Sequence, residues 1–335
     1  MKRYWFLPAV FIVLTTISSF AQTRQKTKQP VPVILDTDIG PDYDDVGAMA
    51  VLHALADAGE ARPLAVMSSN KNELVAPTIS VLNTYFDRPE LPVGAPKSTN
   101  ACDYKAVQEW PELLVKKYPH RIRSTSEAPD AVTLYRKILA QQPDKSVTIV
   151  SIGFLTNLAG LLQSHPDQYS RLEGRDLVTK KVKQLVSMAG KFPEGREYNL
   201  FIDSVASRDV FLHWPTPVIY SGFEIGLKII TGKQLCENEA IKNSPVKDAY
   251  VKAMPYRKGD HNGRHSWDQT AVLVAIKGTA PYYNLQRGKI VINGGNNQWE
   301  NDPNGKQAYL VEALPVEKVR AEIEQLMMHQ PVPKK

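Results

Sequence analysis

The alternation of short apolar runs with longer helical segments restricts the fold of this chain more than any other feature. Residues 31–35 predict a strand, and residues 45–58 follow with Val46, Met49 and Leu52 at helical spacing. Strands are then expected at 62–69, 91–95, 146–153, 183–190 and 216–222, and helices at 76–86, 106–118, 131–141, 156–163 and 205–214. Strands that alternate with helices build a mostly parallel sheet with helices on both faces.

The pattern becomes looser after residue 222. Helices are expected at 247–253, 267–276 and 316–328, and "KIVING" (289–294) is expected to pair with "QAYLVEAL" (307–314) in a late hairpin. Neither an internal repeat nor a low-complexity linker divides the sequence. We therefore predict an α/β fold with a single Rossmann-like domain over residues 31–330, in which helices flank a mostly parallel central sheet.

The first 21 residues have the pattern of a secretory signal peptide. Lys2 and Arg3 precede an apolar stretch over 6–17, and small residues stand at Ser19 and Ala21, where cleavage is expected. An N-terminal membrane anchor is the alternative, but the apolar run is shorter than the roughly 20 residues that a span needs. Residues 22–30 predict a flexible lead-in, so the chain is expected to be periplasmic or secreted.

The charge distribution argues against a nucleic-acid-binding protein, and the cysteine content argues against a disulfide-rich one. The formal net charge is +6 and the basic residues are spread along the chain, so no nucleic-acid partner is expected. No stable membrane association is expected after signal cleavage, and a homo-oligomer is compatible with the sequence. Cys102 and Cys236 do not make a disulfide framework, and whether they pair is left open.

Acidic residues gather between the first predicted strand and the first predicted helix. The segment "DTDIGPDYDD" contains the aspartates Asp36, Asp38, Asp42, Asp44 and Asp45. Other polar segments also follow strands, namely "SSNKN" (68–72), "GFLTN" (153–157) and "GKFPEGREYN" (190–199). Ligands of parallel sheets bind beyond the carboxyl ends of the strands, so we expect a functional site at this edge.

Carboxylates this close together repel one another unless a cation or protons compensate them. All the donor atoms are hard oxygens and no His–Cys spacing indicates zinc, so calcium or magnesium is the expected cation. An acidic helix start would account for Asp44 and Asp45 through the helix dipole, but not for the other three aspartates.

Two other interpretations of the aspartates are tested by their spacing. An EF-hand loop that begins at Asp36 fails, because Pro41 stands where glycine is required and Gly47 where glutamate is required. A phosphatase of the haloacid dehalogenase type fits "ILDTD", with Asp36 as the nucleophile and Asp38 as the acid/base. Ser68 or Ser69 could supply its second-strand hydroxyl. The phosphatase interpretation does not account for Asp44, Asp45 or the features downstream, and it stays open as an alternative.

Four segments together resemble the nucleoside hydrolases of the inosine–uridine preferring type. "DTDIGPDYDD" resembles their aspartate signature, and "GFLTNLAGLL" resembles their G-P-L-T-N-x-A segment with Phe154 in place of proline. "EYNLFID" (197–203) is similar to the family's E-F-N-x-x-x-D segment, and "SWDQTAV" (266–272) to its last metal-binding segment. The segments occur in the family's order, and four segments in order make the resemblance more specific than a single segment would.

The resemblance implies a nucleoside hydrolase fold, a calcium ion and a set of ligands for each part of the substrate. The calcium ligands would be Asp38, Asp45, Asp268 and the backbone carbonyl of Thr156, with two ribose hydroxyls. The ribose would also be held by Asp44, Glu197 and Asn199. Asn70 would lie near the sugar and the base, with Asn72 as its alternative.

The implied reaction is the hydrolysis of the N-glycosidic bond of a ribonucleoside, a small-molecule partner. Carboxylates would stabilise the oxocarbenium-like sugar, while calcium grips the diol and lowers the pKa of a bound water. Asp38 is the expected general base, and Asp44 and Trp267 are the other expected catalytic residues. A binding protein that keeps the metal site without turnover is the non-enzymatic alternative.

The chain departs from the family pattern in the acidic loop and in the loop of residues 190–197. Pro41–Asp42–Tyr43 adds two residues before the aspartate pair, so Asp42 is an alternative for the role of Asp44. The second loop lacks the asparagine that many relatives use on the 5′-hydroxyl. Lys191 and Arg196 are the candidates to replace it.

Trp267 stands where relatives often have the histidine that protonates the leaving base. This resembles the purine-preferring branch, in which an aromatic ring stacks on the base, and so predicts a preference for purine nucleosides. His261 and His265 are the alternative acids, and Tyr198 and Phe201 are expected to be core residues.

Overall fold

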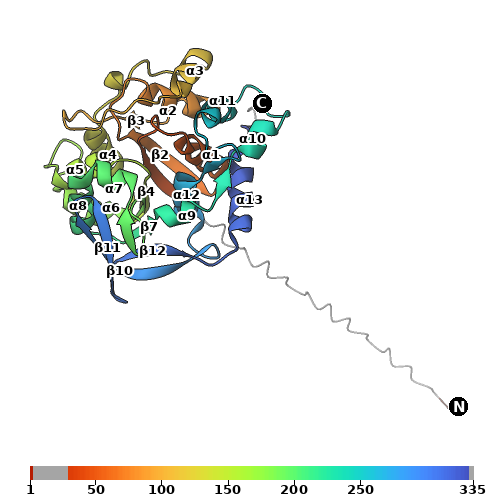
Figure 1. Ribbon diagram of the computed structural model, residues 1–335. Helices are drawn as coiled ribbons and strands as arrows, with labels where there is room; N and C mark the ends of the chain where they lie inside the picture. Colours follow the sequence, from red (N-terminus) through yellow and green to blue (C-terminus); the bar gives the residue numbers. More distant parts are fainter. Residues whose placement is uncertain (3–28, 332–335) are drawn as a thin grey trace.

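Ten strands form one sheet in the order β3-β2-β1-β4-β5-β7-β12-β10-β11-β6 in the computed structural model (Figure 1). The structure describes residues 1–2 and 29–331. The predicted signal peptide falls almost wholly outside these residues, as does most of the predicted lead-in, so both stay predictions. Among the helices of the described residues, none is long and apolar enough to cross a membrane.

The first seven strands of that order are parallel to one another, which confirms the predicted sheet. They are β3 (Val93–Gly94), β2 (Ala61–Ser68), β1 (Val31–Thr37), β4 (Val147–Ser151), β5 (Val182–Met188), β7 (Val218–Ser221) and β12 (Gln307–Glu312). The remaining three pair antiparallel, and they are β10 (Tyr283–Asn293), β11 (Asn296–Asn301) and β6 (Glu194–Arg196).

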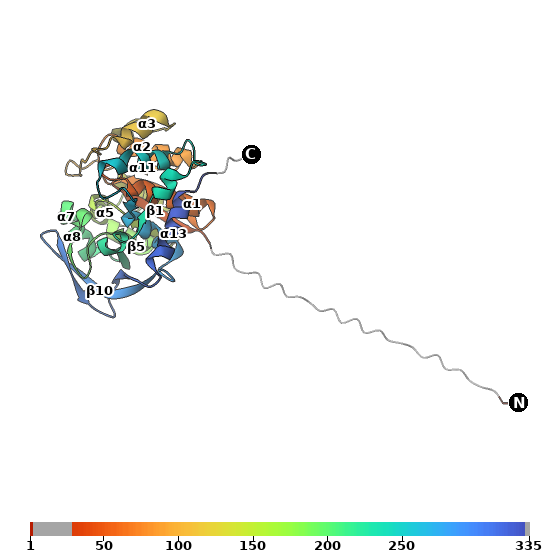
Figure 2. The ribbon, with the colours of Figure 1, turned by 45° about the vertical axis from the view of Figure 1, so that its right-hand side comes forward.

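Helices cover both faces of the sheet, as Figure 2 shows with α1 and α13 on one side and α5 and α8 on the other. The first face is covered by α1 (Asp44–Asp57), α2 (Val75–Tyr85), α3 (Trp110–Lys117), α11 (Pro245–Ala253), α12 (Trp267–Lys277) and α13 (Val316–Met327). The second face is covered by α4 (Ala131–Ala140), α5 (Thr156–Gln163), α6 (Gly174–Lys181) and α8 (Ser204–His213). Alternate residues of β1 supply the two cores, since Val33 and Leu35 join the first and Ile34 joins the second.

Three short helices complete the part of the chain that the structure describes. They are α7 (Tyr198–Ile202), α9 (Phe223–Gly226) and α10 (Lys233–Glu237), while β8 (Ile230–Thr231) and β9 (Arg264–His265) form a separate small sheet. α7 and α9 follow the segments after β5 and β7, at the edge where the strands end. That edge also receives the starts of α1, α5 and α12.

The close packing of α1 on α12 brings two distant parts of the sequence together. A Cβ at Gly47 would lie 2.4 Å from Nε2 of Gln269 and 2.6 Å from the hydroxyl of Tyr250. A larger residue at this position would displace these side-chain ends, which glycine leaves in place. The approach places the aspartates at the start of α1 beside Asp268 at the start of α12.

The strand of the predicted late hairpin has a different partner in the structure, so that prediction is wrong. "KIVING" pairs with β11, from Lys289 opposite Glu300 to Asn293 opposite Asn296, while β12 pairs with the earlier half of β10. Gly294 and Gly295 both have positive φ, 56° and 78°, and they make the tight turn that a two-residue hairpin requires. The two cysteines do not pair, because Cys102 and Cys236 are both free.

Candidate active site

The acidic loop leaves the carboxyl end of β1 in a conformation fixed by its own polar groups. Thr37 donates its hydroxyl to Oδ1 of Asp45 and accepts the N–H of Ile39 at 3.1 Å. Gly40 has φ of +147°, which glycine adopts without strain. The loop therefore turns back so that the start of α1 lies over the end of β1.

A cavity of about 330 Å³ lies beyond this loop. Its acidic lining residues are Asp38, Asp42, Asp44, Asp45, Glu197 and Asp268. The rest of its lining is Pro41, Ile152, Met188, Tyr198, Asn199, Phe223, Arg257, Arg264 and Trp267. The structure thus brings residues from β5, β9, α1, α7, α9 and α12, and from the loops that follow β1 and β4, to one place, and most of the residues that the sequence suggested are among them.

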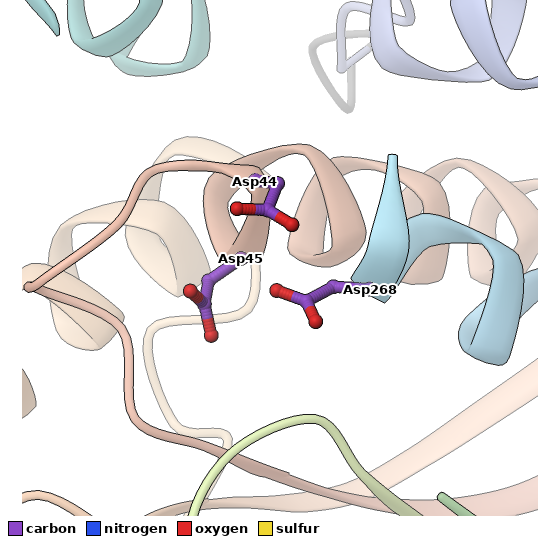
Figure 3. Close-up of side chains that lie close together, drawn as sticks. All are labelled: Asp44, Asp45 and Asp268. Carbon is purple, nitrogen blue, oxygen red and sulfur yellow. The ribbon is translucent and has the colours of Figure 1, made fainter. Parts of the chain in front are cut away.

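Three carboxylates approach one another closely enough to share a cation. One oxygen from each of Asp44, Asp45 and Asp268 can be chosen so that all lie within 4.8 Å of one another, and the three side chains surround one space (Figure 3). Asp38 lines the same cavity but does not belong to this group. The structure therefore assembles Asp45 and Asp268 as expected, with Asp44 in the third place. The metal-binding role of Asp38 stays a prediction.

Burial and mutual repulsion make these carboxylates costly to ionise in the absence of a cation. Burial raises the pKa values of Asp38, Asp45 and Asp268 well above the ordinary value, and repulsion from neighbouring aspartates raises them further. A metal cation would offset both effects, and carboxylate oxygens suit a hard divalent cation. The residues present therefore fit a metal ion.

Asp42 and Asp44 have a cationic partner within the chain. Arg264 donates through Nε and Nη2 to Oδ1 of Asp44 at 3.2 Å each, and through Nη2 to Asp42. Burial raises the pKa of Asp44 to about 7, while the guanidinium lowers it. Asp42 is also 3.5 Å from the guanidinium of Arg257.

Glu197 and Asn199 are held by the backbone around them. Glu197 caps α7, because its carboxylate accepts the N–H groups of Asn199 at 2.8 Å, Leu200 at 3.1 Å and Gly190 at 3.2 Å. Burial raises the pKa of Glu197 to about 7 although these N–H groups lower it. Asn199 donates its side-chain amide to the carbonyls of Met188 at 3.2 Å and Ile152 at 3.4 Å. Both residues line the cavity as expected.

Asn70 does not line the cavity, although it lies next to Asp38. Its amide donates to the carbonyls of Tyr104 at 2.8 Å and Asp38 at 3.3 Å, and it accepts the N–H groups of Tyr104 and Asn72. Asn72 donates to Asp103 at 3.2 Å. Asn70 thus ties the 97–109 segment to the acidic loop, and its expected contact with substrate stays a prediction.

Thr156 also lies outside the lining of the acidic cavity. It begins α5 and borders a separate surface groove, and its hydroxyl donates to Asp203 at 2.8 Å. The expected metal contact involves its backbone carbonyl and stays a prediction.

Asp36 points into the protein and does not line the cavity. Its carboxylate accepts the hydroxyl of Tyr135 at 2.8 Å and the amide of Asn157 at 3.2 Å. Burial raises the pKa of Asp36 to about 7. A carboxylate enclosed in this way is poorly placed for the nucleophilic attack that the phosphatase interpretation requires.

Trp267 lines the cavity and packs against several neighbours. Its ring stacks on Phe223 at 5.2 Å, contacts His265 at 4.8 Å, and donates its N–H to the carbonyl of Phe223 at 2.8 Å. Neither His265 nor His261 belongs to the described lining, so neither alternative acid faces the site.

Tyr198 and Phe201 are not core residues, contrary to expectation, since they are 48% and 40% exposed. Both lie on the short helix α7, whose inward positions are taken by Asn199 and Leu200. The ring of Tyr198 contacts those of Tyr104 and Phe154, each at 6.4 Å, and borders the cavity.

Sequence reasoning missed Arg264, Arg257 and Phe223. Each lies in a segment without a recognised motif. Phe223 directly follows β7, while Arg257 and Arg264 reach the cavity because the chain folds back after β7. Arg264 has one partner nearby in the sequence, Asp260, four positions before it, but Asp44 and Asp42 are 220 and 222 positions away.

The fold and this cavity define the nucleoside hydrolase class, and comparison with known families agrees. Residues 33–320 match the family described as inosine-uridine preferring nucleoside hydrolase. The chain belongs to this family.

Individual relatives are more distant. A pyrimidine-specific ribonucleoside hydrolase RihA from Shewanella sp. (strain ANA-3) is 29% identical over 209 residues, which is 58% of this chain and 59% of that protein. The RihA of Salmonella agona (strain SL483) is 31% identical over 216 residues, 58% of this chain and 61% of that protein. The chain thus spans about three fifths of the length of the curated relatives it matches.

Solved structures of the family share the fold. The purine-preferring ribonucleoside hydrolase from Gardnerella vaginalis superposes with a TM-score of 0.70 at 17% identity, covering 89% of this chain and 98% of that chain. An inosine-uridine preferring nucleoside hydrolase from Bacillus anthracis gives a TM-score of 0.65 at 15% identity, covering 89% and 99%. The single α/β domain is therefore the nucleoside hydrolase fold.

Proposed function

We propose that this protein hydrolyses the N-glycosidic bond of ribonucleosides to free base and ribose, with calcium as its cation and purine nucleosides as the preferred substrates. One observation carries the proposal. Carboxylates from distant parts of the chain converge on one cavity, from Asp38 and Asp45 through Glu197 to Asp268. An oxocarbenium-like sugar is the reaction species that such a surface stabilises best.

Asp45 and Asp268 would hold the cation, together with Asp44 or Asp38. Oxygen ligands from flexible carboxylates suit calcium better than zinc. The cation would lower the pKa of a bound water and bind the two hydroxyls of the ribose diol. The cost of burying these carboxylates supports the proposal, because the described residues offer Asp38, Asp45 and Asp268 no ion pair with a basic side chain.

Asp38 is the proposed general base. It lines the cavity beside the carboxylate group, and as a carboxylate it can accept the proton of the attacking water. Asp44, Glu197 and Asn199 are proposed to position the ribose. Glu197 and Asn199 are themselves fixed by hydrogen bonds to the backbone, which keeps them in place before substrate arrives.

The preference for purines rests on Trp267 and Phe223, which line the cavity and stack on each other. A purine offers a larger π-surface to such a wall than a pyrimidine does. The relatives differ in their preferred base, since one is a pyrimidine-specific and another a purine-preferring ribonucleoside hydrolase.

The test is a panel of inosine, adenosine, guanosine, uridine and cytidine, with release of ribose measured in calcium and in excess chelator. We expect release from the purine nucleosides, faster than from uridine, and none in chelator. Release of ribose that continues unchanged in chelator would contradict the calcium requirement. Thermal stabilisation by nucleosides without any release of ribose would favour the non-enzymatic binding protein.

A further inference from the structure

Arg264 is a buried cation at the centre of the cavity wall. It is only 3% exposed, and it lies within ion-pair distance of Asp42, of Asp44 at 3.2 Å and of Asp260 at 3.7 Å. Most arginines of a protein surface pair with one exposed carboxylate. Burial together with three carboxylates shows that this guanidinium is built into the site.

The hydrogen bonds to Asp44 engage only one of its oxygens. Both Nε and Nη2 of Arg264 donate to Oδ1. Nη2 and Nε are adjacent positions of a rigid fork, and both hold this one oxygen in place. The other oxygen of Asp44 then remains for whatever occupies the space shared with Asp45 and Asp268.

Arg264 also contacts the aromatic part of the wall. Its guanidinium carbon lies 4.9 Å from the ring of Trp267 and 5.3 Å from that of Tyr43. Both are within the range of a cation–π contact. The same side chain therefore connects the carboxylate of Asp44 with the ring expected to face the base.

The two additional residues of the acidic loop belong to the same arrangement. Asp42 binds Arg264 directly, and Tyr43 is fully buried and donates its hydroxyl to Asp260 at 2.6 Å. Asp260 in turn lies beside Arg264 on the segment before α12. The longer loop and the arginine thus form one connected cluster, which we call the arginine cluster: Asp42, Tyr43, Asp44, Asp260 and Arg264.

We propose that Arg264 is a positioning residue, which holds Asp44 in place at the sugar and keeps Trp267 in register with it, without itself being needed for the binding of the cation. The inference deepens the proposed function and depends on it for its activity measurement. Lysine would not serve as well, because an ammonium group lacks the planar fork that binds Asp44 and stacks on the rings.

The experiment compares Arg264→Gln and Arg264→Lys with Arg136→Gln as the matched control. The side chain of Arg136 is likewise 3% exposed and pairs with Asp167 at 2.8 Å, but Arg136 does not line the cavity. For each variant, kcat and KM for inosine, calcium affinity by titration calorimetry, and the melting temperature are measured.

We expect Arg264→Gln to lower kcat/KM by roughly 10- to 100-fold, because small misplacements of a positioned group cost about that much. Calcium affinity should stay equal or become up to about tenfold tighter, because a positive charge near the carboxylates is removed. Arg264→Lys keeps the charge and should therefore keep the calcium affinity of the wild type, yet recover only part of the activity. Arg136→Gln should lower the melting temperature, because it removes buried hydrogen bonds, but leave kcat/KM close to the wild-type value.

A merely structural role for Arg264 would give a different pattern. Activity, calcium affinity and melting temperature would then fall together in Arg264→Gln, and that result would overturn the proposal, as would wild-type activity in this variant. If Arg264→Gln does not fold, Arg264→Lys decides, since full activity in that variant also overturns it. If the proposed function is wrong, the wild-type protein itself will release no ribose. The calcium affinities of the wild-type protein and of Arg264→Gln can still be compared in that case, so the two failures can be told apart.

Discussion

The two halves of the acidic cavity wall compensate their negative charge in different ways. On one side, Asp42 and Asp44 pair with the buried guanidinium of Arg264. On the other side, Asp38, Asp45 and Asp268 pair with no basic side chain among the described residues, and their pKa values are raised well above the ordinary value. The protein supplies a permanent cation to the first half and none to the second.

The two halves of the wall therefore suit different roles. A carboxylate bound by an arginine is held in place, and the guanidinium favours its ionised form, so it suits the recognition of a hydroxyl group. A carboxylate without a partner is costly to bury and gains most from an exchangeable cation. Asp44 belongs to both halves, since one oxygen is bound by Arg264 and the residue also lies in the group with Asp45 and Asp268.

The largest effect is expected from the unpaired half. Asp38→Asn keeps the shape of the side chain but removes its ability to accept a proton, and loss of a general base typically costs about 10²–10⁴-fold in rate. Steady-state kinetics with inosine measures the loss. The fold should persist, which circular dichroism and the melting temperature check.

Asp36→Asn is the matched control for Asp38→Asn, because Asp36 lies near the end of β1 and Asp38 directly after it, but only Asp38 lines the cavity. Asp36 binds Tyr135 and Asn157, so its change should lower stability more than activity. An inactive Asp36→Asn beside a nearly active Asp38→Asn would reverse our assignment and support the phosphatase interpretation.

Removal of calcium is expected to have the next largest effect, on stability. A cation that binds only the folded state at 100 to 1,000 times its dissociation constant stabilises that state by about 2.7–4.1 kcal/mol. Thermal unfolding in calcium and in chelator measures the difference. Equal melting temperatures in the two conditions would contradict a calcium site in the unpaired half.

The stabilisation by calcium should increase with pH. Without the cation, burial raises the pKa of Asp44 to about 7 and the pKa values of Asp45 and Asp268 well above the ordinary value, so their contribution to stability is present below about pH 4 and is lost as the pH rises through these raised pKa values. Binding of calcium holds its ligands ionised and so opposes this loss. The difference in melting temperature should therefore be larger at pH 8 than at pH 5, and a constant difference would argue that protons and calcium do not compete.

A feature of this molecule is predictable from the sequence when the residues that specify it lie close together along the chain. Helix α5 was predicted with its observed bounds, and α1 to within one residue at each end, because apolar periodicity is local. The motifs likewise placed Asp38, Asp45, Glu197 and Asp268 at one edge of the sheet. Each needs only its own strand or helix to be recognised.

The arginine cluster was not predictable in the same way. Arg264 and Asp42 are 222 positions apart and carry no shared pattern, so only the packing of α12 against α1 brings them together. The exposure of Tyr198 was missed for a similar reason. Its neighbours Asn199 and Leu200 take the inward positions of a helix of five residues, which is too short for periodicity to show.

The smallest effect is expected at the aromatic wall, where the two halves meet. Trp267 precedes Asp268 of the unpaired half and stacks against Arg264 of the other. Stacking of a base on an aromatic ring contributes roughly 1–3 kcal/mol, which corresponds to about 5- to 150-fold in rate or affinity. Trp267→Ala should therefore lower kcat/KM for inosine by this factor, and for uridine by less.

Trp267→Phe tests whether the ring acts by stacking or by packing. Phenylalanine keeps a ring against Phe223 but loses the N–H that Trp267 donates to the Phe223 carbonyl, so part of the purine activity should return. Calcium affinity should change little in either variant, because Asp268 is unaltered. An equal loss for inosine and uridine, with a lower melting temperature, would instead mark Trp267 as a packing residue. Of the two rings proposed to stack on the base, Phe223 alone would then remain to support the purine preference.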